Sequence, residues 1–167
     1  MVNCLFLIVL APWLIQGFAA CEPKMNETTL VVNVILDTSA GGTLKSDLVK
    51  VNLVNAGASP VRVAARLSIG YQDSDSREIY AVIRDRTTGE IVGKRSRLYQ
   101  RESLHPSRVR DLEPGRKISA EFHLREWYEI PEGDLEIQIV YDPAEAAKRF
   151  PEIQARRFAS PFVPFSR

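Results

Sequence analysis

The stretch Leu-Val-Lys-Val-Asn-Leu-Val, residues 48–54, decides the fold class because apolar side chains recur in it at every second position. Successive side chains of a β-strand point to opposite faces, so Val49, Val51 and Leu53 share one face and Lys50 lies on the other. We expect the face with the three apolar residues to be buried. The period of two predicts a half-buried strand at this place in the chain.

Stretches with the same period lie on both sides of residues 48–54. Clusters of Gly, Pro, Asn and Asp separate them, and these residues favour turns. The expected strands span residues 29–36, 48–54, 61–67, 78–84, 118–124 and 135–141. A turn at residues 55–57 joins two of them, so residues 48–54 and 61–67 are expected to pair as an antiparallel meander.

Two further segments complete the predicted fold. Residues 143–150 favour a short helix, because a proline at the first position is followed by Ala, Glu and Lys. Residues 157–165 alternate again, but Pro161 and Pro164 cannot donate to a ladder, which indicates an edge strand. The whole pattern predicts an all-β protein, an immunoglobulin-like antiparallel β-sandwich of seven to eight strands with one short helical crossing, over residues 28–167.

The N-terminal segment has the pattern of an export signal. An unbroken apolar run from Cys4 to Ile15 leads to the sequence Phe-Ala-Ala-Cys at residues 18–21. Such a run is typical of a signal peptide and is shorter than the about 20 residues of a membrane-spanning helix. The four residues after it are similar to a bacterial lipobox, with Phe18 where Leu is usual.

We therefore interpret residues 1–20 as a signal peptide, Cys21 as the lipid-attachment residue and residues 21–27 as a short linker. The body of the chain has no further cysteine, so lipidation gives Cys21 a role outside the cytoplasm. The expected location is extracytoplasmic, with the protein lipid-anchored to a bacterial membrane. Two alternatives stay open: cleavage before Ala20, which yields a secreted soluble domain, and an uncleaved anchor.

Charge is nearly balanced over the chain, with a formal net charge of +1, which argues against a nucleic-acid-binding protein. The segment 84–117 is nonetheless rich in Arg and Lys. Candidate contacts for a protein or an anionic envelope partner are Arg95, Arg97 and Arg101 in this segment and the aromatic pair Trp127 and Tyr128. The alternatives are a solvated edge-strand surface for the basic residues and an aromatic plug at one end of the core for the pair.

No catalytic site, metal site or cofactor is predicted. The only histidines, His105 and His123, do not have the spacing of metal ligands. Ser107 and Asp111 lie near His105 in the sequence, but no nucleophile-elbow motif accompanies them, and a triad is defined by geometry in space. We therefore expect a protein that is not an enzyme.

Three stretches carry a resemblance to known domains. Residues 51–57, 112–115 and 131–137 resemble the turns of immunoglobulin-like or fibronectin-like accessory domains of exported proteins, with an Asn-x-Gly turn, a Leu-x-Pro-Gly turn and a Pro-x-Gly entry to the last hairpin. Leu135 stands where that entry usually has an aromatic residue, so a tyrosine corner is not carried over. Residues 47–141 are also similar to the β-sandwich propiece of deuterolysin-type zinc proteases, but the chain has no His-Glu-x-x-His motif, so no protease activity is implied.

Two hypotheses follow for the function. In the first, the chain is an exported, membrane-tethered, non-enzymatic β-sandwich that binds a protein or an envelope polymer. In the second, it is a protease inhibitor or propiece-like domain that docks an edge strand against a protease cleft.

Overall fold

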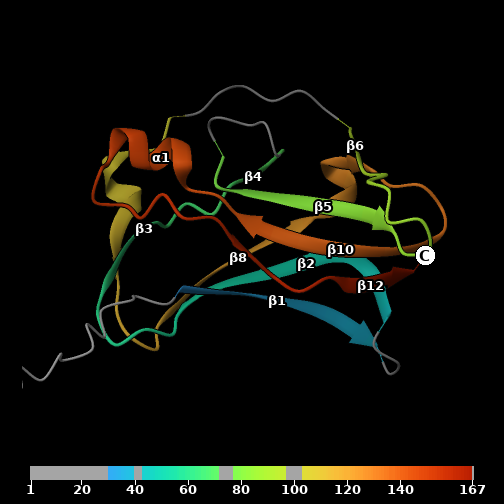
Figure 1. Cartoon of the computed structure of the whole chain (residues 1–167), viewed down its shortest axis with the longest axis horizontal. Coiled ribbons are helices and arrows are strands. Elements are labelled where there is room, and N and C mark those ends of the chain that lie inside the picture. Colours follow the sequence, from blue (N-terminus) through green and yellow to red (C-terminus); the bar gives the residue numbers. More distant parts are fainter. Residues whose placement is uncertain (1–29, 40–42, 72–76, 97–102, 167) are drawn as a thin grey trace, which may run out of the picture.

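The computed structural model describes residues 30–39, 43–71, 77–96 and 103–166, and these form twelve strands, one α-helix and two short 3-10 helices (Figure 1). In chain order the elements are β1 (Leu30–Ser39), β2 (Thr43–Asn55), β3 (Val61–Ala64), β4 (Ile69–Gly70), β5 (Ile79–Asp85), β6 (Lys94–Arg95), η1 (Pro106–Arg108), β7 (Val109–Leu112), β8 (Lys117–His123), η2 (Leu124–Glu126), β9 (Tyr128–Glu129), β10 (Asp134–Tyr141), α1 (Ala144–Arg149), β11 (Phe158–Ala159) and β12 (Val163–Ser166). The predicted all-β sandwich is confirmed.

Strand β2 joins the two layers of the sandwich. One of its edges pairs with β1, and the other pairs with β8 over residues 48–54 and with β12 at Leu44. The first layer is therefore β1-β2-β8, and the second is β12-β10-β5-β4 with β11 beside β10. Figure 1 shows β5 and β10 above β1 and β2. Most pairings are antiparallel; β4 with β5 and β12 with β2 are parallel.

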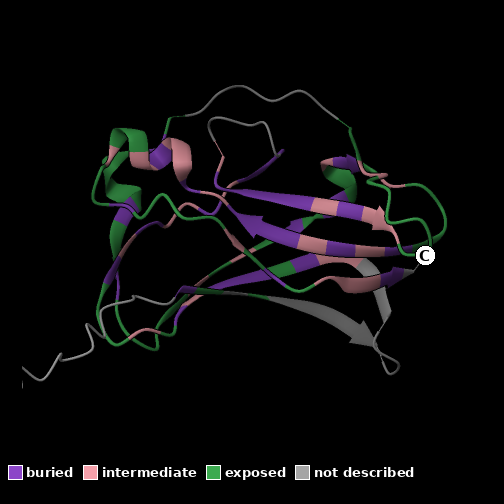
Figure 2. Ribbon diagram, viewed as in Figure 1, coloured by how far each residue is buried: buried purple, intermediate pink, exposed green. Residues whose placement is uncertain are grey.

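The core lies between these layers (Figure 2). Val49, Val51 and Leu53 of β2 are buried, as their spacing predicts, and so are the four inward-facing residues of β10, namely Leu135, Ile137, Ile139 and Tyr141. Each such aliphatic side chain stabilises the fold by about 1.5–3 kcal/mol relative to exposure. The predicted helix is also confirmed, since α1 begins directly after Pro143.

A second, smaller apolar cluster lies at the end of the molecule that holds α1. Strands β3 and β7 form a separate two-stranded ribbon there, and α1 packs on it. The buried members of this cluster are Ala64, Leu104, Val109, Ala146 and Ile153. It closes the end of the sandwich opposite to the β6–β9 ribbon (Figure 1).

The predicted meander of residues 48–54 and 61–67 is wrong. Strand β3 pairs with β7, with Val61 opposite Leu112, and does not pair with β2. The cause is Asn55, whose side-chain amide donates to the carbonyls of Ser59 (2.9 Å) and Leu112 (2.7 Å). These bonds turn the chain out of the layer and hold it against the following ribbon.

The predicted edge position of the C-terminal strand is also wrong. Strand β12 lies between β2 and β10 in the strand order. Pro164 is tolerated there because β12 contacts β2 at a single pair, Phe165 with Leu44, so few ladder bonds are required on that side. The predicted count of seven to eight strands was low because several two-residue strands carry too short a pattern to be recognised.

Candidate functional site

A groove of about 700 Å³ opens beside the β6–β9 ribbon, at the end of the sandwich opposite to α1. One wall comes from the segment that leaves β5 and forms β6, and the other from the segment that follows η2. The groove is lined by Ile91, Val92, Lys94, Ser96, Arg125, Tyr128, Glu129, Ile130 and Pro131.

Local backbone contacts hold the first wall in place. The amides of Val92 and Gly93 both donate to the Ile83 carbonyl, at 2.9 and 3.3 Å, which lays this segment along β5. A Cβ at position 93 would lie 3.0 Å from the Cβ of Ile83. Only glycine therefore lets the chain approach β5 this closely before it enters β6.

The second wall is anchored through η2 and β9. Leu124 is fully buried, and the Trp127 amide donates to its carbonyl at 2.9 Å. In β9 Tyr128 pairs with Arg95 of β6, and its side chain is only 5 % exposed. The Tyr128 ring therefore forms the floor of the groove and belongs to the core at the same time.

An aromatic cluster supports this floor from below. The Tyr71 ring meets the rings of Trp127 and Tyr128 edge to face, with centroids 6.4 and 5.4 Å apart. The Tyr71 hydroxyl also donates to the Trp127 carbonyl at 2.8 Å. The guanidinium of Arg95 lies 5.0 Å from the Tyr71 ring centroid, in the range of a cation–π contact. These contacts make the groove a preformed surface.

The rim of the groove combines positive charge with an apolar side chain. Ile91 is 67 % exposed, and the other large hydrophobic side chain exposed among those that the structure describes is Val31 at 36 %. Lys94 and Arg125 are exposed and make no salt bridge with any residue that the structure describes. Glu129, the acidic residue of the lining, stands opposite Lys94 across the ribbon.

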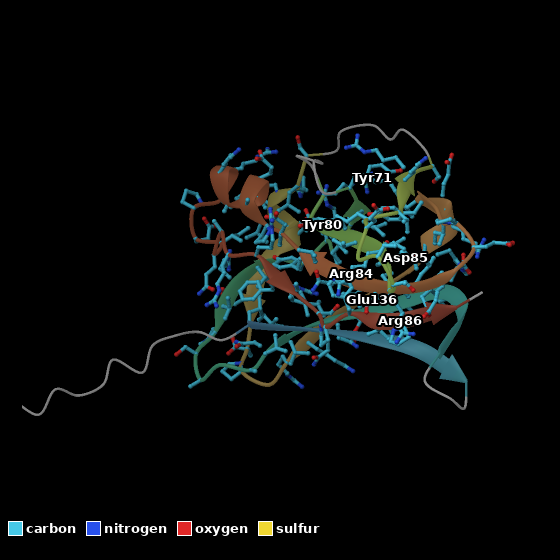
Figure 3. All side chains as sticks on the ribbon, turned by 45° about the vertical axis from the view of Figure 1, so that its right-hand side comes forward. Tyr71, Tyr80, Arg84, Asp85, Arg86 and Glu136 are labelled. Atoms are coloured by element: carbon cyan, nitrogen blue, oxygen red, sulfur yellow. The ribbon has the colours of Figure 1, made fainter. Side chains whose placement is uncertain are left out.

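Other surface cations nearby are already neutralised by partners. On the outer face of β5 and β10, Arg84 pairs with Glu136, and Arg86 pairs with Asp134 at 2.9 Å (Figure 3). These ion pairs link β5, and the turn that follows it, to β10. Lys94 and Arg125 differ from Arg84 and Arg86, because neither makes a salt bridge with a residue that the structure describes.

A second hollow of about 470 Å³ is also lined by Tyr128, together with Tyr71, Arg95 and Arg157. Arg157 is not available to a ligand there, because Asp142 binds it at 2.6 Å and raises its pKa through that hydrogen bond. Burial raises the pKa of Tyr80 on the neighbouring β5. The hollow has fewer uncommitted polar groups than the groove.

The structure brings together three of the contact residues that the sequence suggested. Arg95, Trp127 and Tyr128 meet at the β6–β9 ribbon, and Tyr128 acts as a core plug as well as a groove floor. Arg97, Arg101 and Cys21 lie outside the described residues. Tyr71 and Arg125 were not predicted as site residues from the sequence. Arg125 lies two residues before Trp127, and this proximity is the one signal that could have indicated it.

Both histidines make local contacts on the surface. His105 caps η1, with its Nδ1 accepting from the Ser107 amide at 3.3 Å and lying 2.8 Å from the Ser107 hydroxyl. Asp111 binds Arg62 at 3.0 Å on the neighbouring strand, and His123 pairs with Asp47 on the surface. Within the described ranges no group of three or more His, Cys, Asp or Glu side chains is placed to hold a metal ion.

The fold and the site together define a small β-sandwich with a preformed, basic and partly apolar groove at one end. Comparison with known families found no family model that matches the chain. No curated protein sequence matches it either. Among the residues described, no helix has the length and apolar character needed to cross a membrane.

Proposed function

We propose that this chain is an exported, membrane-tethered, non-enzymatic β-sandwich that binds an acidic, extended segment of a partner protein in the groove beside β6 and β9. The observation that carries the proposal is the placement of Lys94 and Arg125 around the exposed Ile91, on a floor fixed by Tyr128. A rigid floor lowers the entropy that binding costs.

The chemistry of the rim favours an acidic peptide with an apolar residue. Carboxylates of the partner would pair with Lys94 and Arg125, and an aliphatic side chain would cover Ile91. Ile91 would gain about 25 cal/mol for each Å² of apolar surface removed from water. A purely anionic envelope polymer would use the two cations and leave Ile91 exposed, so it matches the groove less well.

The tether in this proposal is a diacylglyceryl group on Cys21, after removal of residues 1–20. It is supported by the apolar run and the Phe-Ala-Ala-Cys sequence that ends it. The intact mass of the mature N-terminal peptide from a membrane fraction tests it. A thioether-linked lipid on Cys21 supports the anchor, and an unmodified start at Ala20 would replace it by a secreted domain.

Binding is tested with a fluorescent peptide of alternating Glu and Leu, and fluorescence anisotropy is the readout. We expect salt-sensitive binding, and a loss of at least about tenfold for Lys94→Glu with Arg125→Glu, since two rim charges are reversed. Arg86→Gln is the matched control, because Arg86 is exposed but already paired with Asp134. Equal binding of an alternating Ser and Leu peptide, or tighter binding of polygalacturonate, would overturn the assignment of an acidic peptide.

A second candidate function rests on the open edge of β1. This ten-residue strand ends the strand order, and in the described part of the chain it pairs only with β2. An edge of this kind can add to an extended strand in a protease cleft, as the inhibitor hypothesis requires. Stoichiometric inhibition of a zinc endopeptidase by the purified chain would favour this function over peptide capture.

A further inference from the structure

The end of the sandwich that holds α1 carries a group of exposed basic residues beside the start of β1. Leu30 opens β1 and pairs with Asn55 of β2. Asn55 in turn donates from its amide to the Arg116 carbonyl at 3.1 Å and accepts from the Gly115 amide at 2.8 Å. The turn before β8 therefore lies about two strand spacings, roughly 10 Å, from the first described residue of β1.

Three cations lie in this turn or close to it, namely Arg110, Arg116 and Lys117, and with Arg108 at the opposite end of β7 we call them the basic end face. All four are exposed, and none makes a salt bridge with a residue that the structure describes. Arg110 lies close to this turn because β7 ends beside Asn55. The Leu112 carbonyl at the end of β7 accepts a hydrogen bond from the Asn55 side-chain amide at 2.7 Å.

Acidic residues offset little of this charge. Asp111 is bound to Arg62 at 3.0 Å, which leaves Glu113 as the one acidic residue of residues 108–117 without a salt bridge inside the described structure. The chain as a whole has a formal net charge of only +1. The positive field of the basic end face is therefore local, and it extends over about one Debye length, roughly 8–10 Å, at physiological salt.

We propose that the basic end face lies against the membrane and contacts anionic phospholipid headgroups. This inference rests on the proposed lipid anchor at Cys21, because the nine residues from Cys21 to Leu30 span at most about 30 Å when fully extended. The anchor keeps β1, and the basic turn beside it, within reach of the bilayer. Cations held near an anionic bilayer are attracted to it, so the basic end face would add a second contact to the one that the lipid anchor makes.

The orientation that follows presents the groove to partners. In Figure 1 β1 begins at the same end as α1 and β3, and β6 lies at the opposite end of the long axis. When the basic end face rests on the headgroups, the groove beside β6 and β9 points away from the membrane. A partner segment can then enter the groove without displacing the lipid contact.

The test uses the mature chain from residue 21, which contains the whole described core, with Cys21→Ser to remove the anchor. Vesicles of phosphatidylcholine with phosphatidylglycerol are compared with vesicles of phosphatidylcholine alone in a sedimentation assay. We expect binding to the anionic vesicles only, with a decrease as salt is raised. Arg110→Glu with Arg116→Glu should weaken binding at least about tenfold, because each basic residue near the surface contributes separately to the attraction.

Lys94→Glu with Arg125→Glu is the matched control, since it reverses two equally unpaired cations at the other end of the molecule. This control should leave vesicle binding unchanged while it weakens peptide binding at least about tenfold, so failure of the groove and failure of the lipid contact are read separately. Circular dichroism confirms the fold of each variant, and Arg110→Gln with Arg116→Gln serves if the Glu variants do not fold. Equal loss in both double variants, equal binding to neutral vesicles, or equally tight binding of soluble polyglutamate would overturn the proposal.

Discussion

The hydroxyl of Tyr128 accepts a hydrogen bond from the backbone amide of Ala81 at 2.9 Å, although the two residues are 47 positions apart in the sequence. The same hydroxyl donates to the Gly70 carbonyl at 2.7 Å. Strand β4 covers β5 only at Ile79 and Tyr80, so beyond it the edge of β5 needs another partner. The Tyr128 phenol takes that place, and it links the groove floor to the second layer of the sandwich.

Tyr128→Phe should therefore destabilise the protein by about 2–4 kcal/mol, because two buried backbone groups lose their partner. Urea unfolding followed by far-UV circular dichroism measures the change. Tyr80→Phe is the control, since the neighbouring Tyr80 is equally buried and its hydroxyl makes no hydrogen bond with a described residue. Equal effects of the two substitutions would show that the bonds of Tyr128 do not support β5.

The buried ion pair of Arg66 and Glu78 gives a second prediction. The Glu78 carboxylate accepts from Arg66 at 2.6 and 3.2 Å and from the Ser68 amide at 3.0 Å, and the two side chains are 12 % and 3 % exposed. Glu78→Gln should destabilise the protein by about 3–5 kcal/mol, because it removes the negative charge of an ion pair that is largely shielded from water. Thermal and urea unfolding measure this loss of stability.

Glu121→Gln provides the comparison for that substitution. Glu121 pairs with Lys50 at 2.6 Å, but both side chains are about half exposed. Solvent screens such a pair, so its loss should cost at most about 1 kcal/mol. A similarly small cost for Glu78→Gln would mean that burial does not strengthen the ion pair of Arg66 and Glu78.

Period-two patterns predict the two layers well, because burial on one face selects apolar residues at alternate positions. Val49, Val51 and Leu53 show this in β2, and Leu135 to Tyr141 show it in β10. The partners of the strands could not be predicted from these patterns. The bond from Asn55 to Leu112, which holds the chain against the β3–β7 ribbon, joins residues 57 positions apart, and nothing in the local pattern indicates it.

The groove could be predicted only in part for a similar reason. Arg95, Trp127 and Tyr128 stand out by type, and the structure does bring them together. Tyr71 enters the site through contacts across the fold, with the rings of Trp127 and Tyr128. The close approach of Gly93 to Ile83, which sets the first wall, depends on the tertiary structure alone.

The buried Tyr141 should make the free energy of unfolding decrease at alkaline pH. Burial raises its pKa above the ordinary value, and the nearby Glu78 charge acts in the same direction. Because the folded-state pKa is the higher one, this contribution is fully present below about pH 10, the unfolded-state value, and it is lost as pH rises further. Urea unfolding between pH 8 and about 11 should show this decline.

Tyr141→Phe tests the cause of the decline. At neutral pH the variant should be less stable by about 1–3 kcal/mol, because the Ala64 amide loses its partner at 3.1 Å. The difference from the unsubstituted chain should shrink above about pH 10, where only the tyrosine loses stability by ionisation. A difference that stays constant with pH would mean that another group controls the alkaline transition.

The last prediction compares two substitutions near the groove, of which the one that changes fewer atoms should destabilise the protein more. Ile91→Ala removes three carbon atoms, but the side chain is 67 % exposed, so stability should change by at most about 0.5 kcal/mol. Gly93→Ala adds one carbon, yet that carbon would lie 3.0 Å from Ile83 Cβ, a backbone-proximal atom that cannot swing away. The segment would have to move off β5, at a cost of about 1–3 kcal/mol.

Both variants should weaken binding of the Glu and Leu peptide, for different reasons. Ile91→Ala removes the apolar contact and leaves the fold intact, whereas Gly93→Ala displaces the wall that carries Lys94. Urea unfolding together with anisotropy separates the two effects. Full peptide binding by a destabilised Gly93→Ala variant would show that the position of this wall does not control the groove.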